Sequence, residues 1–301
     1  MISIIIPTYN NVKSLIALLN TILLEQYNTF EIIIIDDAST DNTQMACNKI
    51  NDKRVKYYCN PKTIGTTKSR LRGIQFAKGM YIKFFDDDDL WISNVLNKQA
   101  ECLNTQNYSF VFGNYKVHNS IDNVEYTRNL SSYQSNFTKQ LLKQPGPFFQ
   151  ACLFKTNFIK KYAKYLDNRA EPSEDWDFFI SLTYNTMNVI HLNKTIFQWN
   201  YNHLSQSADY KQETYALAYI VKKHKDQIIK RGSSKIMAQH YRILGSRFYY
   251  IHNYQKSYNY YKKAFTTYPY AIKNILHRIL QFFPSDIKNF SYNYINKKII
   301  N

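Results

Sequence analysis

Aspartates gather in two clusters, each directly after a short apolar run, and carboxylates in such a position can bind a cation or a hydrogen-bonding ligand. Asp36 and Asp37 follow the apolar run 31–35, and four consecutive aspartates, 86–89, follow the run 80–85. Like charges held close together repel, and a divalent cation or hydrogen-bond donors relieve that repulsion. The clusters therefore predict a binding site rather than two ordinary acidic surface loops.

The segments around these clusters alternate between strand-like and helical patterns. Strands are expected at 2–6, 31–35, 55–59 and 80–85, and helices at 12–25 and 68–77. Continuous runs of Ile and Val are typical of parallel strands buried on both faces. The βαβ pattern predicts an α/β fold, with a mostly parallel sheet covered by helices on both faces. Ligands bind beyond the carboxyl ends of such strands, so 7–10, 36–41 and 86–89 should meet at one sheet edge.

Several other kinds of site are disfavoured by missing patterns. No GxGxxG follows the first apolar run, and no GxxxxGK[ST] occurs, which argues against a dinucleotide fingerprint and a P-loop. The four cysteines lie far apart without a CxxC pair: Cys47, Cys59, Cys102 and Cys152. Neither a zinc site nor a disulfide framework is indicated, and buried reduced thiols are expected.

The charge of the chain is unevenly distributed. The 301 residues are 45% hydrophobic and 16% aromatic, which excludes a disordered chain, and they carry a net charge of +17. Residues 211–301 hold 17 basic and 3 acidic residues, whereas residues 1–210 hold 22 and 19. We therefore expect a nearly neutral domain, 1–210, and a basic helical region, 211–301, suited to an anionic partner. No targeting segment or membrane span is apparent, so a cytosolic location is expected.

Five motifs in order resemble a known family. They are IIIPTYNN, IIIIDDASTDNT, GTTKSRLRGIQFAKGMYI, FFDDDDLW and SEDWDFF. Over residues 1–205 the chain resembles an inverting glycosyltransferase of family 2. The resemblance implies the GT-A fold, which is Rossmann-like with a mostly parallel mixed sheet, followed here by a C-terminal α-helical region.

The first two motifs carry the nucleotide residues that this resemblance implies. Tyr9 would stack on a uracil, and the backbone of Pro7 would contact it. Asp37 would accept a hydrogen bond from the ring N–H, with Asp36 close by. The alternative for Tyr9 is an ordinary turn residue.

The basic segment and the acidic run would hold the diphosphate. Arg70 matches the family's basic position, and its planar fork suits phosphate oxygens. For Lys68 and Arg72 we favour exposed helix charges.

The acidic run resembles the family's DxD-type motif, in which Asp88 would bind Mn²⁺ or Mg²⁺ directly. Asp86 would reach the ribose or a metal-bound water. Asp87, counted with the nucleotide-binding residues, replaces the usual small residue, which leaves the register of the run open by one position. The alternative is an exposed acidic turn.

The motif SEDWDFF carries the catalytic candidate. By resemblance Asp175 is the general base that takes the proton of the acceptor hydroxyl, and its place at a helix start suits a carboxylate. Glu174 would contact the acceptor or support the base. Glu174 and Asp177 are also competitors for the base role, or helix-capping acids. His203, in WNYNHLSQS, matches a metal- or phosphate-contacting position, with a structural histidine as the alternative.

Three further segments have patterns of their own. The polar segment 113–146 is expected to be irregular and to form the acceptor side. Residues 238–271 resemble one tetratricopeptide-type helical hairpin, and a single copy must pack on the catalytic domain or on a partner. Residues 272–283 have the pattern of an interfacial helix that an anionic membrane would attract, or else of a solvated helix face.

The resemblance thus implies a metal-dependent inverting hexosyl- or N-acetylhexosaminyltransferase. The donor would be a UDP-sugar, and the acceptor a glycan or glycolipid hydroxyl in the synthesis of lipopolysaccharide, lipooligosaccharide or capsule. The enzyme would be peripheral on the inner face of the cytoplasmic membrane, with homodimerisation left open. A nucleic-acid binder would explain the basic tail but not the acidic clusters, which repel phosphate, so no nucleic-acid partner is expected. An inactive scaffold is the other alternative, and the presence of Asp88 and Asp175 counts against it.

Overall fold

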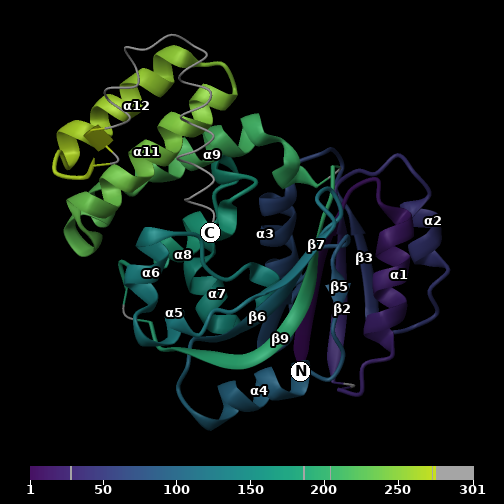
Figure 1. Cartoon of the computed structure of the whole chain (residues 1–301). Coiled ribbons are helices and arrows are strands. Elements are labelled where there is room, and N and C mark those ends of the chain that lie inside the picture. The colour runs from purple at the N-terminus through teal and green to yellow at the C-terminus, as the bar shows by residue number, and fades with distance from the viewer. Residues whose placement is uncertain (28, 186, 204, 273, 276–301) are drawn as a thin grey trace. The chain divides into compact units, whose positions relative to one another are not determined.

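The computed structural model of the chain describes residues 1–27, 29–185, 187–203, 205–272 and 274–275. The chain divides into two compact units, Met1–Ala208 and Asp209–Asn301. Figure 1 shows the course of the chain through both.

The first unit contains a nine-stranded sheet in the order β3-β2-β1-β4-β8-β6-β9-β5, with β7 paired to β6. Its strands are β1 (Ile2–Thr8), β2 (Phe30–Asp36), β3 (Val55–Cys59), β4 (Tyr81–Phe84), β5 (Leu90–Trp91), β6 (Phe110–Asn119), β7 (Val124–Arg128), β8 (Cys152–Lys155) and β9 (Val189–Tyr201). Strands β1 to β4 are parallel. Beyond them only β6 and β9 pair in parallel, and the other pairs are antiparallel. The predicted mixed sheet is confirmed, and its parallel part is concentrated in the first half.

Helices lie on both faces of this sheet, as predicted. They are α1 (Val12–Leu23), α2 (Thr43–Asn48), α3 (Thr66–Phe76), α4 (Leu96–Thr105), α5 (Ser132–Ser135), α6 (Phe137–Lys143), α7 (Thr156–Tyr162) and α8 (Glu174–Leu182). In Figure 1, α1 and α2 lie on one side of the parallel strands and α3 lies on the other. Short 3₁₀ turns connect the elements, and η1 (Phe149–Ala151) runs directly into β8.

Burial on both faces explains the continuous apolar runs of the first two strands. All seven residues of β1 and all seven of β2 are buried. The side chain of Ile5 meets α3 at Gly73, where an added Cβ would lie 2.4 Å from Ile5 Cγ2. A side chain at Gly73 would force the helix away from the sheet, so this glycine sets the close approach of α3.

The expectation that residues 113–146 are irregular is wrong. The segment contains most of β6, the whole of β7, and helices α5 and α6. Strand β7 is largely exposed and pairs with β6 through its backbone. Polar side chains are compatible with such a strand, and they remove the apolar pattern by which a strand is predicted. The four cysteines are free, but of these Cys47 and Cys152 are buried, Cys102 is half-buried, and Cys59 is exposed because it ends the edge strand β3.

The second unit is helical in the residues described. It contains α9 (Tyr210–Lys223), α10 (Lys225–Gln227), a π-helical turn (Ile228–Gly232), α11 (Ser234–Tyr250) and α12 (Tyr254–Thr267). Helices α11 and α12 form a hairpin in which Ser257 Oγ donates to the Gly245 carbonyl at 2.8 Å. Eight residues of 238–271 fall at the tetratricopeptide-type spacing, and all but Pro269, which is half-buried, are buried within this unit: Tyr241, Leu244, Gly245, Phe248, Ser257, Tyr261 and Ala264.

The expected interfacial helix at 272–283 lies outside the described residues, apart from residues 272, 274 and 275. Within the described part of the chain, the helices are too short or too polar to cross a lipid bilayer.

Candidate active site

The carboxyl ends of β1, β2 and β4 lie side by side, as the sequence predicts. The backbone N–H of Asp37 donates to the Thr8 carbonyl at 2.9 Å, just beyond the β1–β2 pairing. On the other side of β1, the N–H of Phe85 donates to the Ile5 carbonyl at 3.0 Å. The loop that follows β1 and both acidic clusters therefore share one edge of the sheet.

The loop after β1 presents an aromatic ring. Tyr9 is 51% exposed, whereas Pro7 is buried within β1. Asn10, which has a φ of 51°, binds the neighbouring loop: its N–H donates to Ser39 Oγ at 2.8 Å, and its side-chain oxygen accepts from the Thr40 N–H at 2.7 Å. These bonds fix the two loops to each other and leave the Tyr9 ring at the surface.

Asp37 organises its own surroundings. Its Oδ1 accepts from Asn60 Nδ2 at 2.7 Å and from the Ile64 N–H at 2.9 Å, and its Oδ2 accepts from the Gly65 N–H at 2.8 Å. Gly65 has a φ of 91°, a conformation that glycine adopts readily. Asp37 therefore holds the loop that leads into α3, a role that the sequence motif did not indicate.

Asp36 also accepts hydrogen bonds from neighbouring residues of the first unit. Its Oδ1 accepts from the Ser39 N–H at 2.8 Å, and its Oδ2 accepts from the Tyr57 hydroxyl. Burial, together with this contact to Asp36, raises the pKa of Tyr57. Asp36 is 1% exposed, so its carboxylate serves the loop after β2.

The four aspartates of the acidic run differ in their partners. Asp87 accepts from Thr8 Oγ1 at 2.5 Å and from Asn11 Nδ2 at 2.9 Å, which ties the run to the Tyr9 loop. Burial raises the pKa of Asp87 to about 7. Asp89 accepts from Gln150 Nε2 at 3.0 Å and from the Asn200 N–H at 3.1 Å.

Asp88 lacks such partners. Among the described residues, no other residue donates a hydrogen bond to its carboxylate, although its backbone carbonyl accepts from Asn200 Nδ2 at 3.0 Å. Burial and the charge of Asp86 raise the pKa of Asp88 to about 6. Asp88 is thus the aspartate of the run whose oxygens remain available to a ligand.

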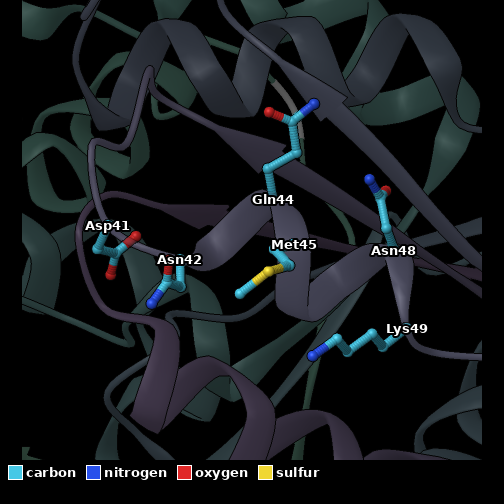
Figure 2. A pocket seen from close by; sticks show the side chains of 6 residues that line it. All are labelled: Asp41, Asn42, Gln44, Met45, Asn48 and Lys49. Atoms are coloured by element: carbon cyan, nitrogen blue, oxygen red, sulfur yellow. The ribbon is translucent and has the colours of Figure 1, made fainter.

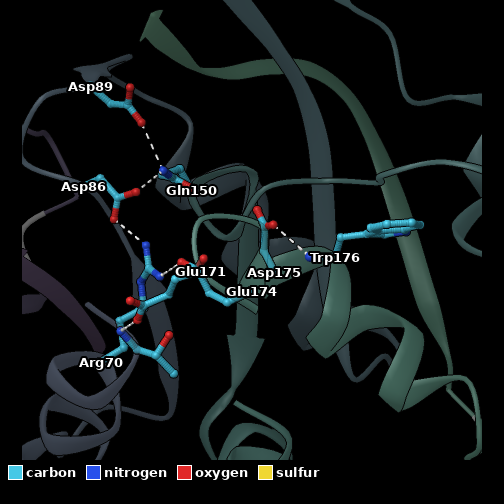
Figure 3. Close-up of polar contacts among 9 residues, drawn as sticks. Arg70, Asp86, Asp89, Gln150, Glu171, Glu174, Asp175 and Trp176 are labelled. Atoms are coloured by element: carbon cyan, nitrogen blue, oxygen red, sulfur yellow. Dashed lines mark hydrogen bonds and ion pairs between the residues drawn. The ribbon is translucent and has the colours of Figure 1, made fainter. Parts of the chain in front are cut away.

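Arg70 joins the acidic run to α8. Its Nη1 lies 2.5 Å from Glu174 Oε1 and its Nη2 lies 2.6 Å from Asp86 Oδ1 (Figure 3). The side chain is only 3% exposed. Burial alone would lower the pKa of Arg70, but Asp86 and Glu174 outweigh it and raise this pKa. The guanidinium therefore bridges two carboxylates from distant segments.

The two other basic residues of α3 differ from each other. Lys68 is exposed, as expected. Arg72 is not a solvated helix charge: its Nη1 donates to the Cys59 carbonyl at 2.8 Å. The expectation for Arg72 is wrong because the end of β3 lies beside α3, which the sequence could not indicate.

The first turn of α8 carries three acidic residues, Glu174, Asp175 and Asp177. None is the N-cap, which is Ser173, and Asp177 is fully buried. Glu174 forms an ion pair with Arg70. Burial raises the pKa of Glu174, although the charge of Arg70 acts to lower it. Asp175 is partly exposed, and Oδ1 accepts from the N–H of Trp176 at 2.8 Å. Burial and the charge of Glu174 raise the pKa of Asp175 to about 8.

The donor set suits a divalent cation that substrate oxygens help to hold. The described residues contain no group of three or more His, Cys, Asp and Glu side chains placed to bind a metal. His203 lies exposed in the turn after β9. Magnesium is commonly bound by one or two carboxylates together with substrate phosphates. Asp88, whose carboxylate receives no hydrogen bond from another of the described residues, fits such an arrangement.

Sequence reasoning missed four residues that shape this site: Thr8, Asn11, Gln150 and Asn200. Asn200 lies in the segment WNYNHLSQS, three positions before His203. Gln150 interrupts the apolar run PFFQACLF, and that isolated polar residue is the signal that could have identified it.

A hollow of about 460 Å³ lies elsewhere on the first unit, at α2 (Figure 2). Its lining residues are Asp41, Asn42, Gln44, Met45, Asn48 and Lys49. Of these, Asp41 ends the predicted loop 36–41, and none was assigned a role of its own in the sequence analysis.

Comparison with known families gives a direct match. Residues 3–166, more than half of the chain, match the family described as glycosyl transferase family 2. The chain belongs to this family. The family 2 match includes the Tyr9 loop, Arg70 and the acidic run, and it ends before α8, so the assignment of Asp175 does not rest on it.

Curated relatives align with part of the chain. The UDP-Glc:alpha-D-GlcNAc-diphosphoundecaprenol beta-1,3-glucosyltransferase WfgD of Escherichia coli is 34% identical over 120 residues, 40% of this chain and 47% of the relative. Glycosyltransferase GlyG of Streptococcus pneumoniae is 32% identical over 124 residues, 40% of this chain and 41% of the relative. The alignments thus span about half or less of each relative.

Solved structures share the fold. Staphylococcus aureus TarS, residues 1–349, in complex with UDP-GlcNAc superposes with a TM-score of 0.63 at 17% identity, over 88% of this chain and 81% of that chain. The mannosyltransferase PcManGT of Pyrobaculum calidifontis, with GDP-Man and Mn²⁺, superposes with a TM-score of 0.58 at 14% identity, over 91% and 77%. The GT-A-type architecture expected for family 2 is confirmed.

Proposed function

We propose that this chain transfers a hexosyl or N-acetylhexosaminyl group from a nucleotide-diphosphate donor to a hydroxyl, with inversion at the anomeric carbon. One observation carries the proposal. The Asp86–Arg70–Glu174 bridge brings the acidic run at the end of β4 together with the first turn of α8. A cation-binding carboxylate and a carboxylate with a raised pKa are thereby held in one site, which is what donor activation and proton removal require.

The donor proposed is a UDP-sugar. The exposed Tyr9 ring is suited to stack on the base, with the Pro7 backbone and the Asp36–Asp37 loop beside it. Support for UDP comes from the relative WfgD, whose name specifies UDP-glucose. Because Asp36 and Asp37 already accept several hydrogen bonds from the protein, we assign them mainly to shaping the base pocket.

A divalent cation, Mn²⁺ or Mg²⁺, is proposed to be held by Asp88 and by donor diphosphate oxygens, with His203 as a further candidate ligand. When bound, it would supply positive charge to stabilise the leaving diphosphate. Asp86 and Asp87 hold the run in place through Arg70 and through Thr8 and Asn11. Arg70 also places a positive charge beside Asp86.

Asp175 is proposed as the general base. A pKa of about 8 lies near neutral pH, where a carboxylate is basic enough to accept the proton of an attacking hydroxyl. Glu174 raises that pKa by its charge, and Arg70 holds Glu174 in place. In-line attack opposite the leaving diphosphate would invert the anomeric configuration.

The acceptor is proposed to be a lipid-linked glycan in surface polysaccharide synthesis, since WfgD is named for a diphosphoundecaprenol-linked acceptor. Residues 1–210 would form the catalytic domain, with 113–146 on its acceptor side. The basic residues of 211–301 would recruit the enzyme to the anionic inner face of the cytoplasmic membrane, and the helical hairpin would serve partner or dimer contacts.

The direct test is release of UDP. Purified chain is incubated with UDP-glucose, UDP-GlcNAc and related donors, with Mn²⁺ or Mg²⁺ and a diphosphoundecaprenol-linked sugar. We expect one UDP-sugar to be consumed with a matching glycosylated product. If no donor binds or is consumed under any of these conditions, the proposed function is wrong.

A further inference from the structure

A buried lysine fixes the backbone of the short turn η1. Lys83, on β4, is fully buried, and its Nζ donates to the Gln150 carbonyl at 2.7 Å and to the Cys152 carbonyl at 3.3 Å. The third donor of the ammonium reaches Gln99 Oε1 at 3.2 Å. Gln99 in turn donates from Nε2 to the Ala151 carbonyl at 3.2 Å. Lys83 and Gln99 therefore donate hydrogen bonds to three successive carbonyls around η1, those of residues 150–152.

Burying the Lys83 ammonium costs free energy, which indicates that the residue does more than fill space in the core. Transferring a lysine ammonium out of water is unfavourable unless all of its donors are satisfied, and here each of the three has an acceptor. Burial lowers the pKa of Lys83 to about 7. An apolar residue at position 83 would avoid that cost but would leave the carbonyls of Gln150 and Cys152 without their donor.

The element that Lys83 holds projects into the acidic run. The side-chain amide of Gln150 donates from Nε2 to Asp86 Oδ2 at 2.5 Å and to Asp89 Oδ2 at 3.0 Å, as Figure 3 shows. The remaining oxygens of these two aspartates are also taken: Asp86 Oδ1 by Arg70, and Asp89 Oδ1 by the N–H of Asn200. One neutral amide thus holds two carboxyl groups of the same run at fixed positions.

Asp88 lies between these two aspartates in the sequence and receives no such hydrogen bond from the described residues. With Asp86 and Asp89 fixed on either side, the run is held in a single register and Asp88 is left with available oxygens. The sequence left open by one position which aspartate of the run binds the cation. The hydrogen bonds of Gln150, held in place by Lys83, select Asp88.

We propose that Gln150 is a positioning residue: Lys83 fixes its backbone carbonyl, and its side-chain amide holds Asp86 and Asp89 so that Asp88 is presented to a divalent cation. This inference rests on the proposed function only in assigning Asp88 to the cation. It concerns how this chain's own residues arrange the run, and it involves no group of the substrate.

The test compares Mn²⁺ binding and turnover in graded variants. Gln150→Leu keeps the size of the side chain and removes both donors, and Gln150→Asn keeps the amide on a shorter stem that can reach only one aspartate. Gln106→Leu, at an exposed position after α4, is the matched control. We measure Mn²⁺ affinity in the presence of UDP by titration calorimetry, the KM for Mn²⁺, kcat, and thermal unfolding.

We expect Mn²⁺ affinity to fall at least tenfold in Gln150→Leu and by less in Gln150→Asn, with a parallel rise in the KM for Mn²⁺. At saturating Mn²⁺, kcat should recover to within a few-fold of the parent, and Gln106→Leu should behave as the parent. Circular dichroism confirms folding, and if Gln150→Leu does not fold, Gln150→Asn carries the comparison.

Unchanged Mn²⁺ affinity and KM in the folded Gln150 variants would overturn the proposal, whatever happens to kcat. A fall in thermal stability alone, with the metal parameters unchanged, would do the same, because it would indicate a purely structural role. If the parent binds Mn²⁺ and UDP but transfers no sugar, the proposed function fails, while the binding comparison still tests the role of Gln150.

Discussion

Arg70, on α3, and Glu174, the first residue of α8, form an ion pair with 2.5 Å between Nη1 and Oε1, although 104 positions separate them in the sequence. The second terminal nitrogen of Arg70 pairs with Asp86 at 2.6 Å. A planar fork with two outward nitrogens can serve two carboxylates at once, which a lysine ammonium does with less geometric definition. This bridge unites the strand-end loops with the helix that carries the base candidate.

Replacing Arg70 should damage both activity and stability. Arg70→Met leaves Glu174 and Asp86 without their partner, and loss of one member of a buried pair typically costs about 3–5 kcal/mol. Arg70→Lys should retain more stability but lose at least tenfold in kcat/KM. Urea unfolding and steady-state kinetics measure these effects. Arg169→Lys, at an exposed pair with Asp167, is the control and should change neither quantity. Normal kcat/KM in Arg70→Lys would show that the fork is dispensable.

Asp175→Asn should abolish transfer while preserving donor binding. Removal of a general base commonly costs about 10²–10⁴-fold in rate. The substitution keeps the size of the side chain, so UDP affinity measured by calorimetry should stay within a few-fold of the parent. Asp122→Asn, in the exposed turn between β6 and β7, provides the control. Substantial turnover in Asp175→Asn would move the base to another residue, with Glu174 or Asp177 next to be examined.

The activity should rise with pH through the pKa of Asp175. A base must be deprotonated to act, and at a pKa of about 8 only a minor fraction is deprotonated at pH 7. We therefore expect kcat/KM to increase between pH 6 and pH 9 with a midpoint near 8. A flat profile over this range would contradict the assignment.

The raised pKa of Asp175 should make the folded chain less stable as the pH rises, whereas activity increases. The folded-state pKa lies above the ordinary value of 3.8, so between these pH values the folded chain binds more protons than the unfolded chain. The contribution of Asp175 to stability is therefore fully present below about pH 4 and is lost as the pH rises through 8. Asp175→Asn should reduce the fall in melting temperature between pH 6 and pH 9, measured by calorimetry.

Removal of the Asp88 carboxylate should abolish metal-dependent binding of UDP. We expect Asp88→Ala to bind UDP equally in Mn²⁺ and in EDTA, whereas the parent should bind more weakly in EDTA. Because no described neighbour donates a hydrogen bond to this carboxylate, the melting temperature should change little. Asp87→Ala offers a contrast, since it removes the partner of Thr8 and Asn11 and should lower stability. An unchanged Mn²⁺-dependent titration in Asp88→Ala would refute the metal assignment.

The full chain should bind vesicles that contain anionic lipid. Each basic residue near such a surface contributes about 1 kcal/mol. Replacing the exposed Lys222, Lys225 and Lys230 by Gln should therefore weaken sedimentation with phosphatidylglycerol vesicles by at least tenfold.

A matched replacement tests whether this effect is local. The exposed lysines Lys160, Lys161 and Lys164 of the first unit should be replaceable with little effect. If both triple variants lost vesicle binding equally, the overall charge of the chain, and not a local basic surface, would account for the binding. Absence of binding to anionic vesicles, or preferential binding to nucleic acid, would exclude the membrane role.

The sequence alone was sufficient for most elements within residues 1–85, but not for β5 to β9 in the rest of the first unit. Buried isoleucines in β1 and β2 and the helical spacing of α1 and α3 are local patterns, and local patterns decide secondary structure. Because parallel strands end at a common edge, those patterns also placed the Tyr9 loop next to both acidic clusters. The acidic first turn of α8 and the α11–α12 hairpin were expected from the resemblance of SEDWDFF to the family motif and of 238–271 to a tetratricopeptide-type hairpin.

Only the tertiary structure decided what each carboxylate does. Asp37 and Asp87 look equivalent to Asp88 in the sequence, yet their oxygens are taken by neighbouring loops. The partners that settle the acidic run come from far along the chain: Gln150 is 64 positions from Asp86, and Asn200 is 111 positions from Asp89. Hydrogen bonds depend on distances of about 3 Å between atoms, and residue types and spacing fix such distances only within one local element.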